Sequence, residues 1–188
     1  MNILRFPERD TPPYLREQVL ALQDQAWPGF FSADRPPGHD PALRPLSMLL
    51  VVDGRVVASL DILSKQIVHA GQTYAASGLS TVVTDQALRG KGFGNRLVSA
   101  ARDEIESSGA DLGIFTCDTE LRPFYESAGW QVVDGAVLVG GTPDAPFPSD
   151  QFDKATLAAF FTEPARHHAD DFRNSRIDLY PGSLDKLW

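Results

Sequence analysis

At 188 residues, with 43% apolar residues and a formal net charge of −8, the chain has the size and composition of a single globular domain, residues 1–188. No apolar run approaches the ~18 residues of a membrane span, and the surplus of carboxylates disfavours nucleic acid, whose phosphates are bound by clustered Lys and Arg. The acidic balance favours a cationic partner, or it simply keeps the protein soluble. With Cys117 as the single cysteine and no signal-peptide pattern at the start, we expect a cytoplasmic protein without disulfides or a membrane anchor.

Hydrophobic spacing and turn residues predict a mixture of helices and strands. Proline at position 12 or 13 suits the first turn of a helix, and Asp53-Gly54 suits a two-residue hairpin turn. In the N-terminal half we predict, in chain order, a helix over 13–26, a proline-rich loop or short irregular helix over 30–45, strands over 48–52 and 55–68, and a turn at 69–72 into a strand that ends at Thr84 with a buried part over 79–84. In the second half we predict a helix over 94–107, a strand over 112–117, a helix carrying 122–130, a strand over 131–139 with a bend at 134–135, a loop over 140–153 and a strand over 155–161. No pattern defines the C-terminal tail.

A glycine-rich loop, Arg89 to Gly94, joins the predicted strand 79–84 to the predicted helix 94–107. Residues without Cβ let several backbone N–H groups approach an anion, and the helix N-terminus and two cations add positive charge. The spacing fits neither the dinucleotide fingerprint nor the P-loop. The loop therefore indicates a pyrophosphate cradle of another kind, with a plain strand-to-helix turn as the alternative.

The spacing that fits is [Gln/Arg]-x-x-Gly-x-[Gly/Ala], met by Arg89, Gly92 and Gly94, so the chain resembles the GNAT superfamily of acetyl-CoA-dependent N-acetyltransferases. A second segment, Phe124-Tyr125-Glu126-Ser127-Ala128-Gly129-Trp130, is similar to that superfamily's Phe-Tyr-Glu-x-x-Gly-[Phe/Trp] motif. The two motifs lie within residues 79–130, and their pairing is more specific than either alone.

This resemblance implies a mixed α/β (α+β) fold, in which helices flank a twisted, mostly antiparallel sheet with splayed central strands. It implies a cofactor-binding core over about 78–130 and acceptor-side elements over 1–45 and 140–188. Acetyl-CoA would be held by backbone groups of the glycine-loop strand and by the loop itself: Val82, Val83, Thr84, Arg89, Gly90, Lys91, Gly92, Phe93, Gly94 and Asn95. Tyr125 matches the tyrosine that protonates the departing thiolate, and a phenol stays neutral at pH 7.

The general base is not defined by the sequence. Many relatives place a glutamate on the glycine-loop strand, where this chain has Ser80, which would have to relay the proton through water. The other candidates are Asp34, Asp40, Asp150, Asp153, His39 and the carboxylate of Trp188, each of which could also be an ordinary solvated residue. Adjacent histidines 167 and 168 cannot both face one ion, so we predict no metal site.

A closer resemblance, over roughly residues 78–130 and at the C-terminus, is to the aminoglycoside 2′-N-acetyltransferases. In that family carboxylates in the early loop, in the loop before the last long strand and at the chain end hold a polycationic aminosugar. The corresponding substrate-binding positions here are Asp34, Asp40, Thr116, Asp150, Asp153 and Trp188. Ser80 in place of the strand glutamate, Lys186 near the end and a longer tail depart from the family.

We therefore expect an acetyl-CoA-dependent N-acetyltransferase acting on a primary amine of a small, cationic molecule, with an aminoglycoside as one candidate. Other amines, namely a polyamine, an amino acid or a protein lysine, remain open. A CoA-binding regulatory module without enzymatic activity is the alternative from a different class. The sequence does not decide between a monomer and a homodimer.

Overall fold

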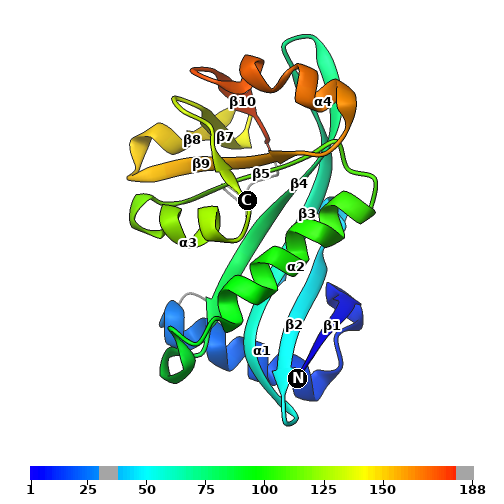
Figure 1. The fold of residues 1–188 in the computed structure, drawn as a ribbon, viewed down its shortest axis with the longest axis vertical. Helices are drawn as coiled ribbons and strands as arrows, with labels where there is room; N and C mark the ends of the chain where they lie inside the picture. Colours follow the sequence, from blue (N-terminus) through cyan, green and yellow to red (C-terminus); the bar gives the residue numbers. More distant parts are fainter. Residues whose placement is uncertain (30–37, 181–188) are drawn as a thin grey trace.

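The computed structural model describes residues 1–29 and 38–180. Within them a seven-stranded sheet has the order β1-β2-β3-β4-β5-β9-β6, and a three-stranded sheet has the order β10-β7-β8 (Figure 1). The elements are β1 Asn2–Pro7, α1 Pro13–Ala26, β2 Leu46–Val52, β3 Arg55–His69, β4 Gln72–Thr84, α2 Phe93–Ser107, β5 Leu112–Asp118, α3 Arg122–Ser127, β6 Gln131–Val132, β7 Val137–Thr142, β8 Ala145–Pro148, β9 Lys154–Phe160, α4 Glu163–His167 and β10 Arg176–Asp178.

The large sheet is antiparallel except where β4 meets β5, and there the pairing is short. Only Ala76 with Leu112 and Ser77 with Gly113 pair across this parallel contact. Beyond Ser77, β4 continues to Thr84 without a partner strand on that side, while its other edge remains paired with β3. The expected splay of the central strands is thereby confirmed.

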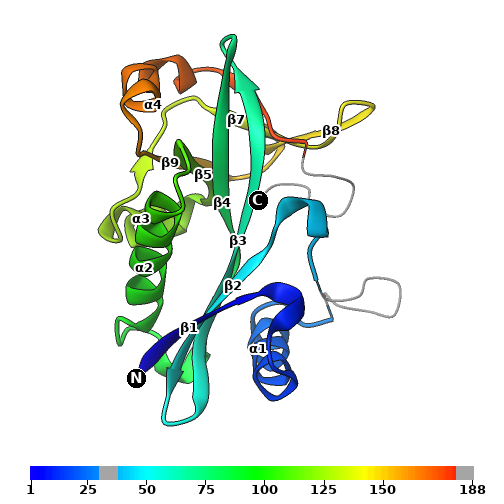
Figure 2. The same ribbon diagram turned by 90° about the vertical axis from the view of Figure 1, so that its right-hand side faces the viewer.

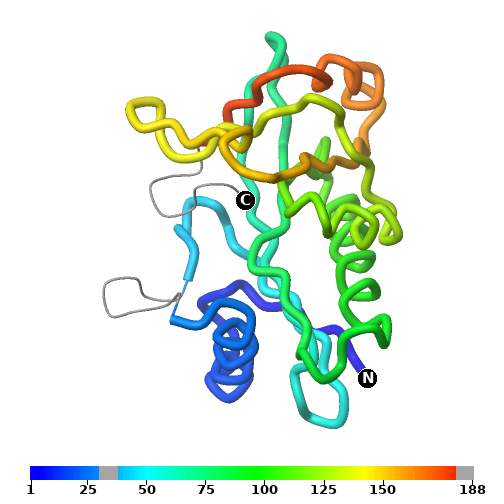
Figure 3. Tube along the Cα trace, turned by 90° about the vertical axis from the view of Figure 1, so that its left-hand side faces the viewer, coloured from blue at the N-terminus to red at the C-terminus, as the bar shows by residue number. Residues whose placement is uncertain are grey.

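Helices α1 and α2 cover opposite faces of the large sheet (Figures 2 and 3). Under α1 lies a small core that includes Leu15, Leu49 and Val83. Under α2 lies the main core, which includes Leu97 and Ile114 and extends to β9. The sheet therefore separates two environments, and β4 contributes side chains to both.

Most predicted elements are present, but one strand was missed and two predictions about the chain's organisation were wrong. The edge strand β1 was not predicted, since its short polar and apolar mixture ends at a proline. The expected single strand over 131–139 is two strands, β6 and β7, which belong to different sheets. The expected loop over 140–153 contains the end of β7 and the strand β8, which pair with one another.

Among the described residues, no helix combines the length and the apolar character needed to cross a bilayer.

Candidate active site

The glycine loop begins at a firmly anchored turn at the end of β4. The buried carboxylate of Asp85 accepts a hydrogen bond from the backbone N–H of Ala87 at 2.9 Å and pairs with Arg55 on β3. After this turn, Gly90 and Gly92 adopt left-handed backbone angles of φ 75° and 81°, which residues with a side chain rarely adopt. Helix α2 then starts at Phe93, so the first N–H groups of the helix, which have no partner within it, face the loop.

Gly94 allows the N-terminus of α2 to lie directly against β4. A Cβ at this position would lie 2.6 Å from Oγ1 of Thr84 and 3.4 Å from Cζ of Phe124. The side-chain amide of Asn95 donates to Oγ of Ser127 at 2.8 Å and so ties α2 to α3. The side chain of Asn95, a predicted cofactor residue, is thus engaged with α3. Its backbone N–H, in the first turn of α2, is the group that could reach a cofactor.

The backbone of β4 presents alternate N–H groups to the splay. The backbone N–H of Asp85 donates to the carbonyl of Val57 on β3. Val83, two residues before Asp85, lies opposite Ser59, two residues after Val57. Because antiparallel pairs alternate between hydrogen-bonded and non-hydrogen-bonded positions, Val83 also faces β3. Val82 and Thr84 therefore direct their backbone groups towards the splay, whereas the predicted contribution of the Val83 N–H to cofactor binding does not agree with this alternation.

Tyr125 lies on α3 in an aromatic cluster. Its side chain is buried, with its ring edge-on to those of Phe115 and Phe124 at centroid distances of 5.1 and 4.9 Å. Burial raises the pKa of the phenol, and the neighbouring Cys117 and Asp118 raise it further. The hydroxyl is therefore protonated at neutral pH and can act only as a proton donor or as a neutral hydrogen-bond group.

Ser80 meets a histidine from the segment that precedes β2. His39 Nε2 lies 3.0 Å from Ser80 Oγ, and His39 Nδ1 lies 3.2 Å from Oε1 of Glu8. The backbone N–H of His39 also donates to Oε2 of Glu8 at 2.9 Å, so one carboxylate holds both the main chain and the ring. With Nδ1–H donating to Glu8, Nε2 is the acceptor for the Ser80 hydroxyl. The His39 side chain is only 7% exposed.

A second carboxylate, Asp61 on β3, completes this network on the α1 face of the sheet. Its Oδ1 accepts from Oγ of Ser47 at 2.5 Å and its Oδ2 from Oγ1 of Thr81 at 2.6 Å, while His39 Nδ1 lies 4.0 Å from Oδ2. Thr81 has a left-handed backbone, φ 50°, at a register shift between β3 and β4. The bulge and the carboxylate are thus joined by one hydrogen bond.

The two carboxylates have opposite pKa shifts. Burial alone would raise the pKa of Glu8, but hydrogen bonds from His39 and the charges of His39 and Arg16 outweigh it and lower the pKa below the ordinary value. Burial raises the pKa of Asp61, against the opposing effects of His39 and the two hydroxyl donors. Glu8 is therefore the ionised partner of the imidazole at neutral pH.

Glu8, His39 and Asp61 also bring three potential metal-ligand atoms within 4.8 Å of one another. All four carboxylate oxygens of Glu8 and Asp61, however, accept hydrogen bonds from protein donors. The hydrogen-bonded network accounts for this cluster without an ion.

Among the described residues, the predicted acceptor carboxylates each contact a local partner rather than one another. Asp40 caps the turn that follows it by accepting from the N–H of Ala42 at 2.9 Å, Asp150 pairs with Arg176 at 3.1 Å, and Asp153 accepts from Thr119 Oγ1 at 2.6 Å. Thr116 is half-buried on β5. Asp34 and Trp188 lie outside the described residues. Each described carboxylate has a local partner that explains its position.

A family model described as "Acetyltransferase (GNAT) domain" matches residues 12–133, well over half of the chain. The chain belongs to the GNAT acetyltransferases. No curated protein matches significantly.

Several solved structures share the fold of this acetyltransferase. Escherichia coli ElaA superposes with a TM-score of 0.58 at 17% identity, covering 84% of this chain and 99% of its own. An aminoglycoside 6′-N-acetyltransferase complexed with coenzyme A gives 0.60 at 16%, covering 86% and 98%. The enzyme of that name from Enterococcus faecium gives 0.59 at 16%, with the same coverage. These likenesses establish the GNAT fold, as expected from the two motifs.

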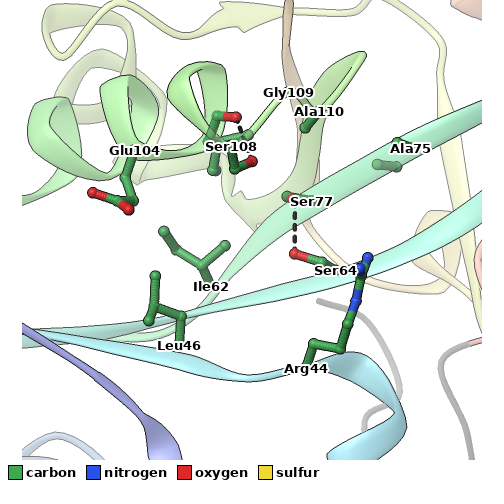
Figure 4. A pocket seen from close by; sticks show the side chains of 12 residues that line it. Arg44, Leu46, Ile62, Ser64, Ala75, Ser77, Glu104, Ser108, Gly109 and Ala110 are labelled. Carbon is green, nitrogen blue, oxygen red and sulfur yellow. Dashed lines mark hydrogen bonds between the residues drawn. The ribbon is translucent and has the colours of Figure 1, made fainter.

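One cavity of about 270 Å³ in the acetyltransferase lies away from all these residues. It is found between the C-terminal end of α2 and strands β2 to β4, where Glu104 and Ser108 face Ile62 and a hydrogen-bonded pair, Ser64 and Ser77 (Figure 4). None of the residues predicted for catalysis or cofactor binding lines it. It therefore contributes nothing to the candidate site.

Sequence reasoning missed Glu8 and Asp61. Asp61 did carry a signal, because a carboxylate within the apolar run Leu60 to Leu63 is rarely buried without partners. Glu8 carried none, since it lies in a polar segment between β1 and α1 and reaches His39 across 31 positions.

Proposed function

We propose that this acetyltransferase transfers the acetyl group of acetyl-CoA to a primary amine of a small cationic molecule, with His39 as general base and Tyr125 as general acid. The observation that carries the proposal is the contact between His39 Nε2 and Ser80 Oγ on the strand that also bears the splayed N–H groups. It supplies a base where the sequence shows no strand carboxylate.

The residues of the glycine loop fit a CoA pyrophosphate. Gly90 and Gly92 have left-handed backbone angles, and a Cβ at either position would have no neighbouring atom within 4 Å, which leaves room for an anion beside the loop. Arg89 and Lys91 are exposed beside them and add positive charge. Val82 and Thr84 would pair with the pantetheine arm, and the bound group supplies an activated acetyl thioester.

His39 would take a proton from the substrate ammonium, either directly or through the Ser80 hydroxyl, which leaves the neutral amine free to attack the thioester. An imidazole suits this step because it changes charge near neutral pH, and Glu8 stabilises the positive charge that the ring acquires. Ser80 lies four residues before Thr84, which is about 13 Å along an ordinary strand. The base is thus separated from the pyrophosphate cradle by the distance over which an extended cofactor arm would lie along β4.

Tyr125 would return a proton to the departing thiolate. Its raised pKa keeps the phenol protonated, and the same apolar surroundings raise the pKa of the neighbouring thiol of Cys117 to about 11. A thiolate leaving into such surroundings is a stronger base than it is in water, so it would take up a proton readily, and the protonated phenol of Tyr125 would be the donor.

The acceptor class rests on charge and on likeness. The net charge of −8 favours a cation, and two of the structurally similar proteins are aminoglycoside 6′-N-acetyltransferases, whereas the sequence motifs resemble the 2′ enzymes. We propose an aminoglycoside as the first candidate and leave the position of acetylation open. Asp34, Asp40, Asp153 and Trp188 remain predicted acceptor residues, while Asp150 is the weakest of this set because Arg176 neutralises it.

The test is thiol release from acetyl-CoA over a panel of aminoglycosides, polyamines, amino acids and lysine peptides. His39→Gln should lower turnover on the true acceptor by about 10²- to 10⁴-fold, and Tyr125→Phe should lower it while CoA affinity is retained. His168→Gln, at a partly exposed histidine paired with Asp171, and Tyr74→Phe, at a buried tyrosine, are the matched controls.

Full turnover in His39→Gln would refute the assignment of the base. Tight CoA binding without turnover on any amine would favour the CoA-binding module.

A further inference from the structure

We propose that Ser80 is itself a nucleophile, activated by the hydrogen-bonded triad Glu8, His39 and Ser80. The triad would let this protein transfer the acetyl group of acetyl-CoA to Ser80 Oγ and then to water, which releases acetate. The inference rests on the proposed binding of acetyl-CoA along β4, but it adds a thioester hydrolase activity that needs no amine.

The geometry is that of a hydroxyl nucleophile activated by a base that a third group orients. Oγ of Ser80 and Nε2 of His39 are 3.0 Å apart, within the range of nucleophile-to-base hydrogen bonds. The carboxylate of Glu8 holds Nδ1 at 3.2 Å and the backbone N–H of the same histidine at 2.9 Å. One tautomer is thereby favoured, with the unprotonated Nε2 directed at the serine hydroxyl.

The electrostatics of the triad also suit this role. Glu8 is ionised at neutral pH, because its hydrogen bonds from His39 lower its pKa despite burial. An ionised carboxylate on Nδ1 stabilises the imidazolium that forms when Nε2 takes a proton. Asp61, 4.0 Å from the same Nδ1, adds negative charge when it is ionised.

Ser80 is distinguished from the other hydroxyls of β4 near it by its partner. Ser77 shares its hydrogen bond with Ser64 at 2.8 Å, and Thr81 donates to Asp61 at 2.6 Å. Ser80 is half-buried, whereas Ser77 is 3% exposed. Among these three, the hydroxyl of Ser80 is the one that meets an imidazole nitrogen.

The reaction balances with water as the second reactant. The Ser80 hydroxyl proton moves to His39 Nε2 while Oγ bonds to the thioester carbonyl carbon; the carbon–sulfur bond breaks, and the sulfur takes the proton from Nε2. Water then attacks the acetyl ester, giving its proton to Nε2, which returns it to Oγ as the ester bond breaks. The products are free CoA and acetate. Backbone N–H groups of the splay, such as that of Val82, are candidates to stabilise the oxyanion.

The experiment measures thiol release from acetyl-CoA in the absence of any amine, together with the mass of peptides from acid-quenched protein. Cleavage after Lys65 and Arg89 yields the peptide 66–89, in which fragmentation separates Ser77, Ser80 and Thr81. We expect an acetyl group on Ser80 and amine-independent thiol release. Ser80→Ala and His39→Gln should each lower that release at least 100-fold, and Ser77→Ala should leave both readouts unchanged.

Calorimetric titration with CoA shows whether each variant is folded and binds the cofactor. Thiol release that persists in Ser80→Ala, or an absence of acetyl-Ser80 in the wild-type protein, would overturn the inference. Amine acetylation without amine-independent release would refute it and leave the proposed function standing. Ser80-dependent hydrolysis with no acceptor in the amine panel would support it and count against the proposed acceptor class.

Discussion

Replacing Gly94 with alanine is expected to weaken cofactor binding more than it destabilises the fold. The added Cβ would lie 2.6 Å from Oγ1 of Thr84, where ordinary contact begins at 3.4 Å, and Phe124 limits retreat on the other side. The first turn of α2 must therefore move away from β4 by about 0.8 Å, or Thr84 must rotate. Either change alters the spacing between the helix N–H groups and the strand N–H groups that are proposed to hold CoA.

The magnitudes differ for stability and binding. Overpacking costs about 1–3 kcal/mol, and the higher helix propensity of alanine recovers about 1 kcal/mol, so a net loss of ~0–2 kcal/mol in unfolding free energy is expected. A misplaced charge-assisted hydrogen bond to the pyrophosphate costs about 1.5–3 kcal/mol, which corresponds to ~10- to 100-fold in the Kd for CoA.

The assay is calorimetric titration with CoA beside urea unfolding, in a double-mutant cycle with Thr84. Thr84→Ala removes the clashing oxygen and should restore much of the affinity lost in Gly94→Ala, whereas Thr84→Val keeps an atom in the same place and should not. Unchanged CoA affinity in Gly94→Ala, or equal rescue by alanine and valine, would refute the reasoning.

Three further predictions concern buried groups. Burial raises the pKa of Cys117 to about 11, which leaves ~0.1% thiolate at pH 8 against ~24% for an ordinary thiol, so native alkylation should be over 100-fold slower than in urea; rates within tenfold would contradict this. The raised pKa of Asp61 means that the folded state binds a proton more tightly than the unfolded state, so its contribution to stability falls as pH rises above the unfolded pKa of ~4. Asp61→Asn should therefore gain stability relative to the wild type over that range, and parallel stability curves would exclude the effect. Gly113→Ala would place a Cβ 2.7 Å from the ring of Trp130 and should cost about 1–3 kcal/mol in urea unfolding, with altered tryptophan emission; wild-type stability would show that the ring can move.

The elements that could be predicted from sequence carry their signals locally. Helix α1 begins at Pro13 as its proline indicated, the Asp53-Gly54 hairpin turn is present, and α2 starts one residue before the predicted position. The bend at Asp134-Gly135 was also expected. Its consequence was not, because β7 leaves the large sheet to pair with β8 and β10, and the choice of partner strand depends on distant parts of the chain.

The candidate site shows the same division between local and distant information. Ser80 and His39 were each named as candidates for the proton transfer, but the contact between them spans 41 positions and no periodicity encodes it. Glu8, which precedes α1 in the sequence, contacts His39, which follows that helix. The Val83 N–H was assigned to the cofactor from the family resemblance, and the sequence does not reveal the bulge that sets which residues of β4 face β3.

That bulge explains why β4 can serve both faces of the sheet. Before the bulge, Ala75 exchanges hydrogen bonds with Asp111 beside β5. The backbone N–H and C=O groups of the even-numbered residues up to Ser80 therefore face β3. After the bulge, the N–H of Asp85 donates to the carbonyl of Val57, so the backbone groups of the odd-numbered residues face β3.

The change of phase occurs at Thr81, whose left-handed backbone is costly for a β-branched residue. Its hydrogen bond to the buried Asp61 offsets part of that cost. Without the bulge, Val82 and Thr84 would direct their N–H groups at β3 and the splay would lose these donors. Asp61, the carboxylate near the proposed base His39, thus also stabilises the backbone conformation on which the proposed cofactor site depends.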